Sequence, residues 1–138
     1  MIRPTEGIAT DAAHSMKNGK TEYQAIGLAT REQLFYKDLG NQTTNIGEFL
    51  AVVEAVKYII ENDFRPRRIF TDSTTAIAWF EAKKTSSTKP CRDLQRAEMF
   101  LRALSADIES IEVIHWDNKK WGETPADFGN KGNSRKQS

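Results

Sequence analysis

Short stretches that alternate apolar and polar residues occupy the first forty positions, and they predict three β-strands. We expect these strands at residues 8–10, 23–29 and 33–39. Asn18 and Gly19 lie in the polar segment between the first two strands, and such a pair is typical of a turn. Short turns join antiparallel neighbours, so the sequence predicts a three-stranded meander.

The longest apolar periodicity in the chain begins after Asn45 and predicts an amphipathic helix. Its apolar residues recur at the spacing of one helix face: Phe49, Val52, Val53, Val56, Ile59 and Ile60. Pro66 prevents the helix from continuing, because proline lacks the backbone N–H that a helix needs.

The rest of the chain predicts two more strands and three more helices. We expect strands at residues 67–71 and 110–116 and a helix at residues 73–84. A further helix is capped by Asp93 and turns Leu94, Ala97, Leu101 and Leu104 to one side, and a short last helix starts near Pro125. Residues 85–90 form a linker and residues 119–122 a loop. The segment joining the last two strands contains helices, as parallel pairing requires, so an α/β fold with a mixed sheet results.

Length and composition indicate one globular domain. The chain has 138 residues, 28% of them charged and 38% hydrophobic, and its net charge of +1 gives no general attraction to nucleic acid. We expect a domain over residues 1–132 and a polar, basic, disordered tail over residues 133–138. Cys91 is the single cysteine, which excludes an internal disulfide and any zinc site built on several cysteines. No apolar run approaches 18 residues, so we expect a cytoplasmic protein without membrane contact.

Four carboxylates stand at the ends of predicted elements. Asp11 and Asp72 each follow an apolar run, and Glu48 and Asp127 lie at the starts of helices. Each has a structural explanation, as a helix cap or a turn residue. Taken together they indicate a metal site, because clustered like charges repel and persist only with cations to neutralise them. Four oxygen donors suit Mg²⁺ or Mn²⁺.

The short motifs that contain these four acids resemble the motifs that contain the conserved acids of ribonuclease HI. The matching motifs are Thr10-Asp11-Ala12-Ala13, Thr44-Asn45-Ile46-Gly47-Glu48, Thr71-Asp72-Ser73 and Ala126-Asp127. The resemblance covers nearly the whole chain and implies a ribonuclease H-like fold, a five-stranded mixed sheet with helices on both faces. It implies that the strands carrying Asp11 and Asp72 lie side by side. It further implies cleavage of the RNA strand of RNA–DNA hybrids, with two metal ions held by Asp11, Glu48, Asp72 and Asp127 once substrate is bound.

The resemblance also implies substrate contacts. Those on this chain are Asn18, Thr43, Thr44, Asn45 and Ser73. Small polar groups of this kind suit the 2′-hydroxyl by which a protein distinguishes RNA from DNA. For the Thr-Thr-Asn run, plain helix capping is an equal alternative.

The chain departs from the family in two places. Bacterial members often carry a basic protrusion where this chain has only residues 85–92, so it is a short form, and Lys83 and Lys84 are candidates to bind DNA phosphates instead. The loop before the last acid lacks the usual histidine, and Glu123 is the nearest titratable substitute. His115 does not replace it, since it alternates with Ile111 and Val113 and is expected on a buried strand face.

Two other functions remain open at this stage. One is a catalytically silent domain that binds hybrids, and the other is a nuclease of the same fold that acts on DNA. The four intact acids argue against the first, and Glu48 after Thr44 and Asn45 favours the hybrid-specific branch over the second. No feature of the sequence indicates a protein partner.

Overall fold

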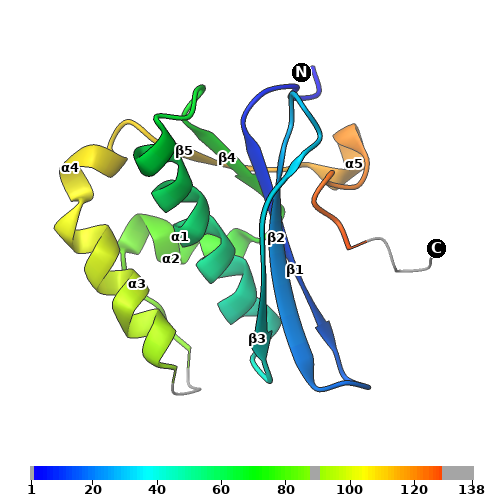
Figure 1. Ribbon diagram of the computed structural model, residues 1–138, viewed down its shortest axis with the longest axis vertical. Helices are drawn as coiled ribbons and strands as arrows, with labels where there is room; N and C mark the ends of the chain where they lie inside the picture. Colours follow the sequence, from blue (N-terminus) through cyan, green and yellow to red (C-terminus); the bar gives the residue numbers. More distant parts are fainter. Residues whose placement is uncertain (1, 88–90, 129–138) are drawn as a thin grey trace.

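A five-stranded mixed sheet organises the molecule (Figure 1). The computed structural model describes residues 2–87 and 91–128. The strands are β1 (Ile8–Ser15), β2 (Lys20–Gly27), β3 (Gln33–Gly40), β4 (Arg68–Thr71) and β5 (Glu112–His115), and their order across the sheet is β3-β2-β1-β4-β5. The first three strands pair antiparallel, whereas β4 lies parallel to both β1 and β5. The predicted meander and the predicted parallel pair are confirmed.

The helices follow the apolar periodicity, with shifted ends. They are α1 (Thr44–Asn62), α2 (Thr74–Ala82), α3 (Arg92–Ala103), α4 (Ser105–Ile108) and α5 (Asn118–Trp121). Thr43 caps α1, since its side chain accepts from the backbone N–H of Ile46. Cys91 occupies the cap position of α3, so the expectation that Asp93 is the cap is wrong; Asp93 lies inside the first turn.

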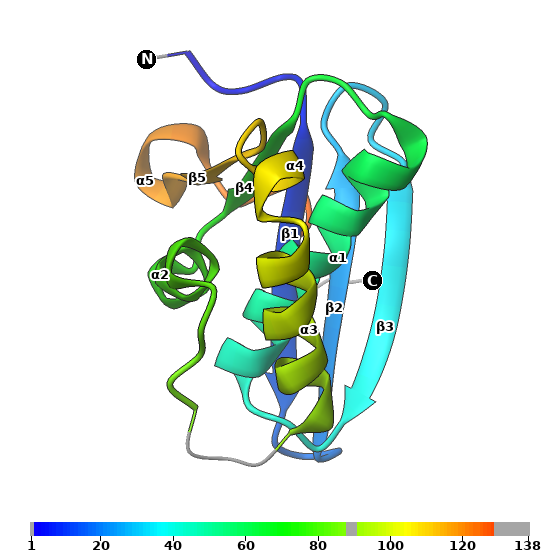
Figure 2. The same cartoon turned by 90° about the vertical axis from the view of Figure 1, so that its left-hand side faces the viewer.

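Each face of the sheet has its own hydrophobic core. α1 covers one face with a continuous buried stripe that includes Phe49, Val52 and Val56, and α3 packs outside α1 (Figure 2). On the other face Trp116 and Trp121 pack edge to face with their ring centroids 5.1 Å apart. The short helix α5 lies on this second face (Figure 1). Helices therefore occupy both faces, as the sequence predicted.

Two expectations near the C-terminal end of the described chain are wrong. Residues 119–122 were expected as a loop, but Asp117 accepts hydrogen bonds from the backbone N–H groups of Lys119 and Lys120 and starts α5. Conversely, no helix starts near Pro125 within the described residues: residues 125–126 form a turn, and residues 127–128 are irregular. The predicted tail, residues 133–138, lies outside the described residues.

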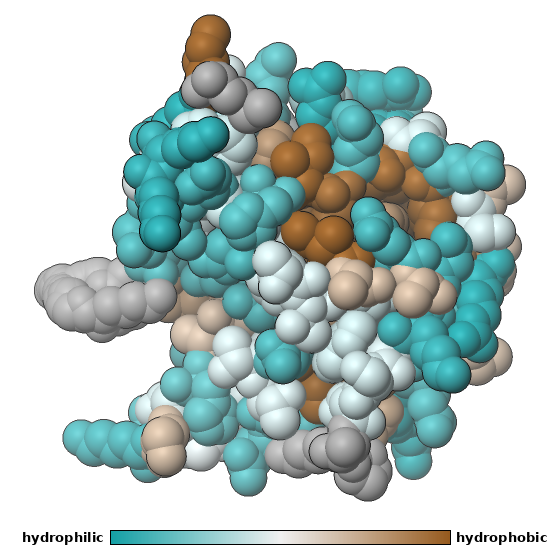
Figure 3. All heavy atoms as spheres, turned by 180° about the vertical axis from the view of Figure 1, so that it is seen from behind, coloured by the Kyte–Doolittle hydropathy of each residue, from teal (hydrophilic) through white to brown (hydrophobic). Residues whose placement is uncertain are grey.

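The edge strand β5 differs from its expected burial. His115 is exposed, and the expectation that it is buried with Ile111 and Val113 is wrong. His115 is the last residue of β5, a strand at the edge of the sheet, where it pairs with Thr71 in the last register position. Seen from behind, on the side where β5 and α2 lie, one patch of hydrophobic side chains is open to view among hydrophilic ones (Figure 3).

In the described part of the chain, no helix has the length and hydropathy needed to cross a membrane.

Candidate metal centre

The parallel pairing of β1 and β4 brings two of the predicted acids together. Ile8 lies opposite Ile69 and Ala9 opposite Phe70. Continued by two residues, this register sets Asp11 opposite Asp72. Strand β4 ends before Asp72, whereas β1 runs on to Ser15, so Asp11 is not at a strand end as expected. It lies on the part of β1 that extends beyond its shorter neighbour.

Glu48 reaches the same place from α1, and Gly47 makes this approach possible. A Cβ atom on Gly47 would lie 3.0 Å from the Cβ of Ala12 on β1 and 3.0 Å from Cγ2 of Thr21 on β2, closer than ordinary contact. The helix backbone therefore rests directly on the two strands. Because consecutive residues on a helix point in different directions, Glu48 projects past the contact point towards the end of β4.

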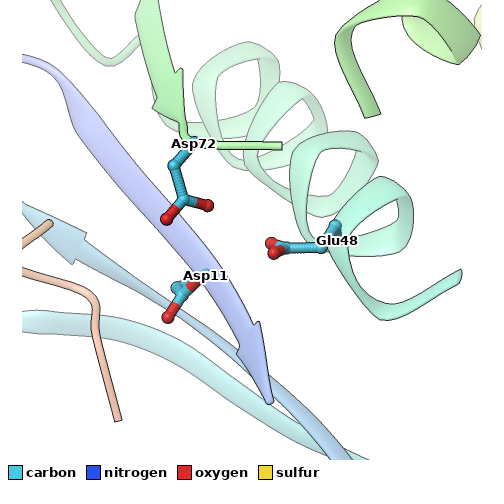
Figure 4. Close-up of side chains that lie close together, drawn as sticks. All are labelled: Asp11, Glu48 and Asp72. Atoms are coloured by element: carbon cyan, nitrogen blue, oxygen red, sulfur yellow. The ribbon is translucent and has the colours of Figure 1, made fainter. Parts of the chain in front are cut away.

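One carboxylate oxygen from each of Asp11, Glu48 and Asp72 lies within 4.8 Å of the other two. Their side chains point towards one another from β1, α1 and the end of β4 (Figure 4). Asp11 and Glu48 are only 4% and 7% exposed, and Asp72 is half-buried. Three hard oxygen donors at this spacing, two of them removed from water, fit a divalent cation such as Mg²⁺ or Mn²⁺. We call Asp11, Glu48 and Asp72 the acidic triad.

A neighbouring amide restrains the triad. The Nδ2 of Asn118, the first residue of α5, donates to Oδ2 of Asp72 over 3.0 Å. Trp121 anchors α5 in the second core, so the backbone that carries Asn118 is held in place. A hydrogen bond of this kind orients a ligand carboxylate. Sequence reasoning missed this contact, because Asp72 and Asn118 are 46 residues apart and no local pattern links them.

Asp127 comes from a buried turn rather than a helix. It is not a member of the group within 4.8 Å that the described residues form. Its backbone N–H donates to the carbonyl of Thr124 over 3.0 Å, and Thr124 and Ala126 are almost fully buried. The side-chain Nε2 of Gln24 donates to the carbonyl of Ala126 over 2.6 Å. Gln24 is the cross-strand partner of Asp11, so the turn that carries Asp127 is attached next to the triad.

A polar pocket of about 390 Å³ lies between the start of α1, one side of α2 and the segment that follows α2. Its lining residues in the described part of the chain carry hydroxyl, amide and indole groups and no charge: Thr43, Asn45, Thr75, Trp79, Ser86 and Ser87. The Nε1 of Trp79 donates to Oγ of Ser86 over 3.1 Å. Two of the predicted substrate contacts, Thr43 and Asn45, belong to this pocket. Sequence reasoning missed Ser86 and Ser87 because the 85–90 segment was expected to be only a linker, and it treated Thr75 and Trp79 only as parts of a helix.

Glu98 on α3 fixes the segment that closes this pocket. Its Oε2 accepts from the backbone N–H of Thr85 over 2.9 Å and from the Thr85 hydroxyl over 2.7 Å. The Thr85 hydroxyl is the main cause that lowers the pKa of Glu98 below its ordinary value, because a hydrogen bond to the carboxylate favours the charged form.

The other predicted substrate contacts do not line the pocket. Asn18 is exposed in the turn between β1 and β2, and Thr44 is exposed in the first turn of α1. Lys83 ends α2 and Lys84 is exposed beside it. Ser73 caps α2 by accepting from the backbone N–H of Ala76.

Glu123, the predicted substitute for the loop histidine, and His14, three residues after Asp11, are not members of the triad. Glu123 is exposed. His14 forms a 2.7 Å hydrogen bond with the hydroxyl of Thr21, which itself donates to the carbonyl of Gln42. The hydroxyl proton is therefore used, so Nδ1 of His14 is the donor in its bond.

Comparison with known proteins identifies the fold. No protein-family model matches the chain. The LC11-RNase H1 isolated from compost by a metagenomic approach is 14% identical, with a TM-score of 0.56 over 82% of this chain and 84% of that one. RNase H1 from the halophilic archaeon Halobacterium salinarum NRC-1 is 16% identical, with a TM-score of 0.53 over 86% and 90%. The complex of LC11-RNase H1 with an RNA/DNA hybrid gives 13% identity and a TM-score of 0.54 over 85% and 88%. The chain therefore has the ribonuclease H-like fold that its motifs predicted.

Proposed function

We propose that this chain is a metal-dependent ribonuclease H, an endonuclease that hydrolyses the RNA strand of RNA–DNA hybrids. The observation that carries the proposal is the acidic triad, three carboxylates from separate elements with oxygens within 4.8 Å. Such a cluster is unfavourable without a cation, because like charges in a partly buried site repel. The ribonuclease H-like fold adds support, as does the neighbour solved with an RNA/DNA hybrid.

The chain's own residues would hold the metal and the substrate. Asp11, Glu48 and Asp72 supply the ligand oxygens, Asp127 is the proposed fourth carboxylate, and Asn118 keeps the Asp72 carboxylate in one orientation. Divalent ions bound there, two with substrate, would activate a water for attack and stabilise the leaving 3′ oxygen. The carboxylates would hold the ions in position, so the protein would contribute positioning rather than covalent chemistry.

The polar pocket supports a nucleic-acid substrate. Its hydroxyl and amide groups suit phosphate and sugar oxygens, which receive most protein hydrogen bonds in nucleic-acid complexes. We assign Thr43, Asn45 and their pocket neighbours to one strand of the hybrid. Asn18, Thr44 and Ser73 are proposed as contacts near the triad. Lys83 and Lys84 are proposed as phosphate contacts beside the pocket.

A cleavage assay with end-labelled duplexes tests the proposal. RNA–DNA, RNA–RNA and DNA–DNA duplexes of one sequence are incubated with Mg²⁺, with Mn²⁺ or with excess EDTA. We expect cleavage of the RNA strand of the hybrid only, and only with a metal. Cleavage in EDTA would contradict the metal mechanism. Cleavage of DNA–DNA would make the chain a DNA nuclease of this fold, and hybrid binding without cleavage would make it a silent binding domain.

A further inference from the structure

The side chain of Gln24 connects three segments beside the acidic triad. Its Nε2 donates to the carbonyl of Ala126 over 2.6 Å, and its Oε1 accepts from Nε2 of Gln33 over 2.8 Å. Gln33 lies on β3, Gln24 on β2 and Ala126 in the C-terminal turn. A carbonyl oxygen can only accept, so the Gln24 amide group that faces Ala126 must be the NH₂, and its orientation is fixed.

The turn that Gln24 holds is the one that carries Asp127. Two hydrogen bonds lie within the turn itself: the Asp127 N–H donates to the Thr124 carbonyl over 3.0 Å, and the Ala126 N–H donates to the Thr124 hydroxyl over 3.4 Å. The turn is not part of a helix in the described chain, so no helical ladder fixes its position relative to the sheet. Ala126 packs in the second core with Trp116 and Trp121. Contact of one methyl group holds the turn against the sheet, but it restrains the turn's position along the sheet only weakly.

Gln24 lies directly across from Asp11, a member of the acidic triad. It pairs with Asp11 across β1 and β2, so the two side chains lie on the same face of the sheet. The hydrogen bond to Ala126 therefore sets the distance between the backbone beside Asp127 and the strand position beside Asp11. A shift at this bond would move the proposed fourth carboxylate relative to the triad without changing any member of the triad.

We propose that Gln24 is a positioning residue for Asp127, holding the turn of residues 124–127 in place beside Asp11. This inference rests on the proposed function, in which Asp127 acts with the triad. Gln24 is not a member of the acidic triad and does not line the polar pocket, so its proposed role is one of positioning. Outer residues that orient ligands typically change metal affinity or activity about 10- to 100-fold when they are replaced.

Replacement of Gln24 by Met tests the role, because Met keeps the length of the side chain and removes the donor. Gln24→Glu is a second variant, which sets a carboxylate oxygen against the Ala126 carbonyl. Glu22→Gln is the matched control: it lies two residues earlier on β2, on the same face, and its contacts are to Lys20 and Tyr36 rather than to the turn. All variants are compared by thermal melting to establish that they fold.

The first readout is amide hydrogen exchange of Asp127 in the metal-free protein, which needs no activity. We expect exchange about tenfold faster in Gln24→Met and Gln24→Glu than in the parent, and no change in Glu22→Gln. Unchanged exchange in both Gln24 variants would overturn the proposal. This arm stands even if the parent cleaves no hybrid, an outcome that would refute the proposed function alone.

The second readout is a double-mutant cycle with Asp127→Asn on the cleavage of hybrid. We expect Gln24→Met to lower kcat about tenfold with little change in KM. In the Asp127→Asn background it should lower kcat no further, because Gln24 acts only through Asp127. Losses that multiply in the double variant would show that Gln24 acts on the fold in general, and would overturn the proposal.

Discussion

At the scale of single residues, the acidic triad makes the clearest prediction. Asp11→Asn and Asp72→Asn should each reduce hybrid cleavage by orders of magnitude, because each removes one charge from a shared metal site. The metal-free variants should melt at the same temperature as the parent or higher, since one like-charge repulsion is relieved. Cleavage and thermal melting of the two variants, with the exposed Asp107→Asn as control, test this. Near-parental cleavage by either variant would remove that residue from the site.

The loop without a histidine leads to a second prediction at this scale. Glu123 is exposed and lies four residues before Asp127. A positioned acid or base contributes about 100-fold or more to a rate, but an exposed loop residue that helps product leave should contribute less. Glu123→Gln is therefore expected to lower steady-state turnover by about two- to fivefold and leave the single-turnover rate unchanged. If both rates equal those of the parent, Glu123 has no part in turnover.

At the scale of elements, Gly47 shows how α1 reaches the site. In a helix interior Ala is more favourable than Gly by about 1 kcal/mol, so a glycine here needs a reason, and the close approach to Ala12 and Thr21 supplies it. Gly47→Ala should push the start of α1 from the sheet and move Glu48. We expect a loss of about 1–3 kcal/mol in stability and weaker Mn²⁺ binding.

Thermal melting and calorimetric titration with Mn²⁺ measure both effects of Gly47→Ala. Glu61→Ala, an exposed change in the last turn of the same helix, is the control and should leave Mn²⁺ binding unchanged. A higher melting temperature with unchanged Mn²⁺ affinity would show that the strands make room for the methyl group and that Gly47 does not set the position of Glu48.

The contact between Glu98 and Thr85 gives a pH-dependent prediction for α3. The pKa of Glu98 is lowered from its ordinary value of 4.5, so the folded state favours the charged form. The stabilisation is therefore fully present above the ordinary pKa and is lost as the pH falls through the lower, folded value. Glu98→Gln should cost about 1 kcal/mol at pH 7. Melting curves across pH should show this difference shrinking below pH 4.5; a constant difference would contradict it.

The sequence was informative about elements wherever apolar periodicity continued for several turns or strand pairs. The stripe through Phe49 and Val56 fixed α1, and the apolar run before Asp72 fixed β4. Periodicity could not reveal α5, because a four-residue helix held by the Asp117 cap and by Trp121 has no repeating pattern. It also placed a helix after Pro125, where burial of the turn and the bond from Gln24 determine the backbone.

The same limit applies to the site. Asp11, Glu48 and Asp72 could be chosen from their settings at element ends, and the structure brings them together. The contacts of Gln24 and Asn118 span 102 and 46 residues, and no local pattern carries information about such pairs. The role of Asp127 and of the substrate contacts stays a prediction.

At the scale of the whole molecule, the small net charge determines how the chain should bind a hybrid. With a charge of +1 and no basic protrusion, general electrostatic attraction is weak. Binding should depend on a few local phosphate contacts, with Lys83 and Lys84 at the end of α2 the main candidates. We expect weak affinity that falls steeply with salt, since each neutralised phosphate releases counterions.

Replacement of Lys83 and Lys84 by Ala tests this distribution of charge. If both contact phosphates, the slope of log affinity against log salt should become shallower by about 2, close to one for each lysine. Lys37→Ala with Lys57→Ala removes the same charge from exposed positions on β3 and α1, and should leave the slope unchanged. Fluorescence anisotropy of a labelled hybrid, titrated at several salt concentrations with Ca²⁺ in place of Mg²⁺ to limit cleavage, measures both pairs. Equal slopes for the two pairs would mean that Lys83 and Lys84 are solvated helix-end charges, and the phosphate contacts would then have to come from the polar pocket alone.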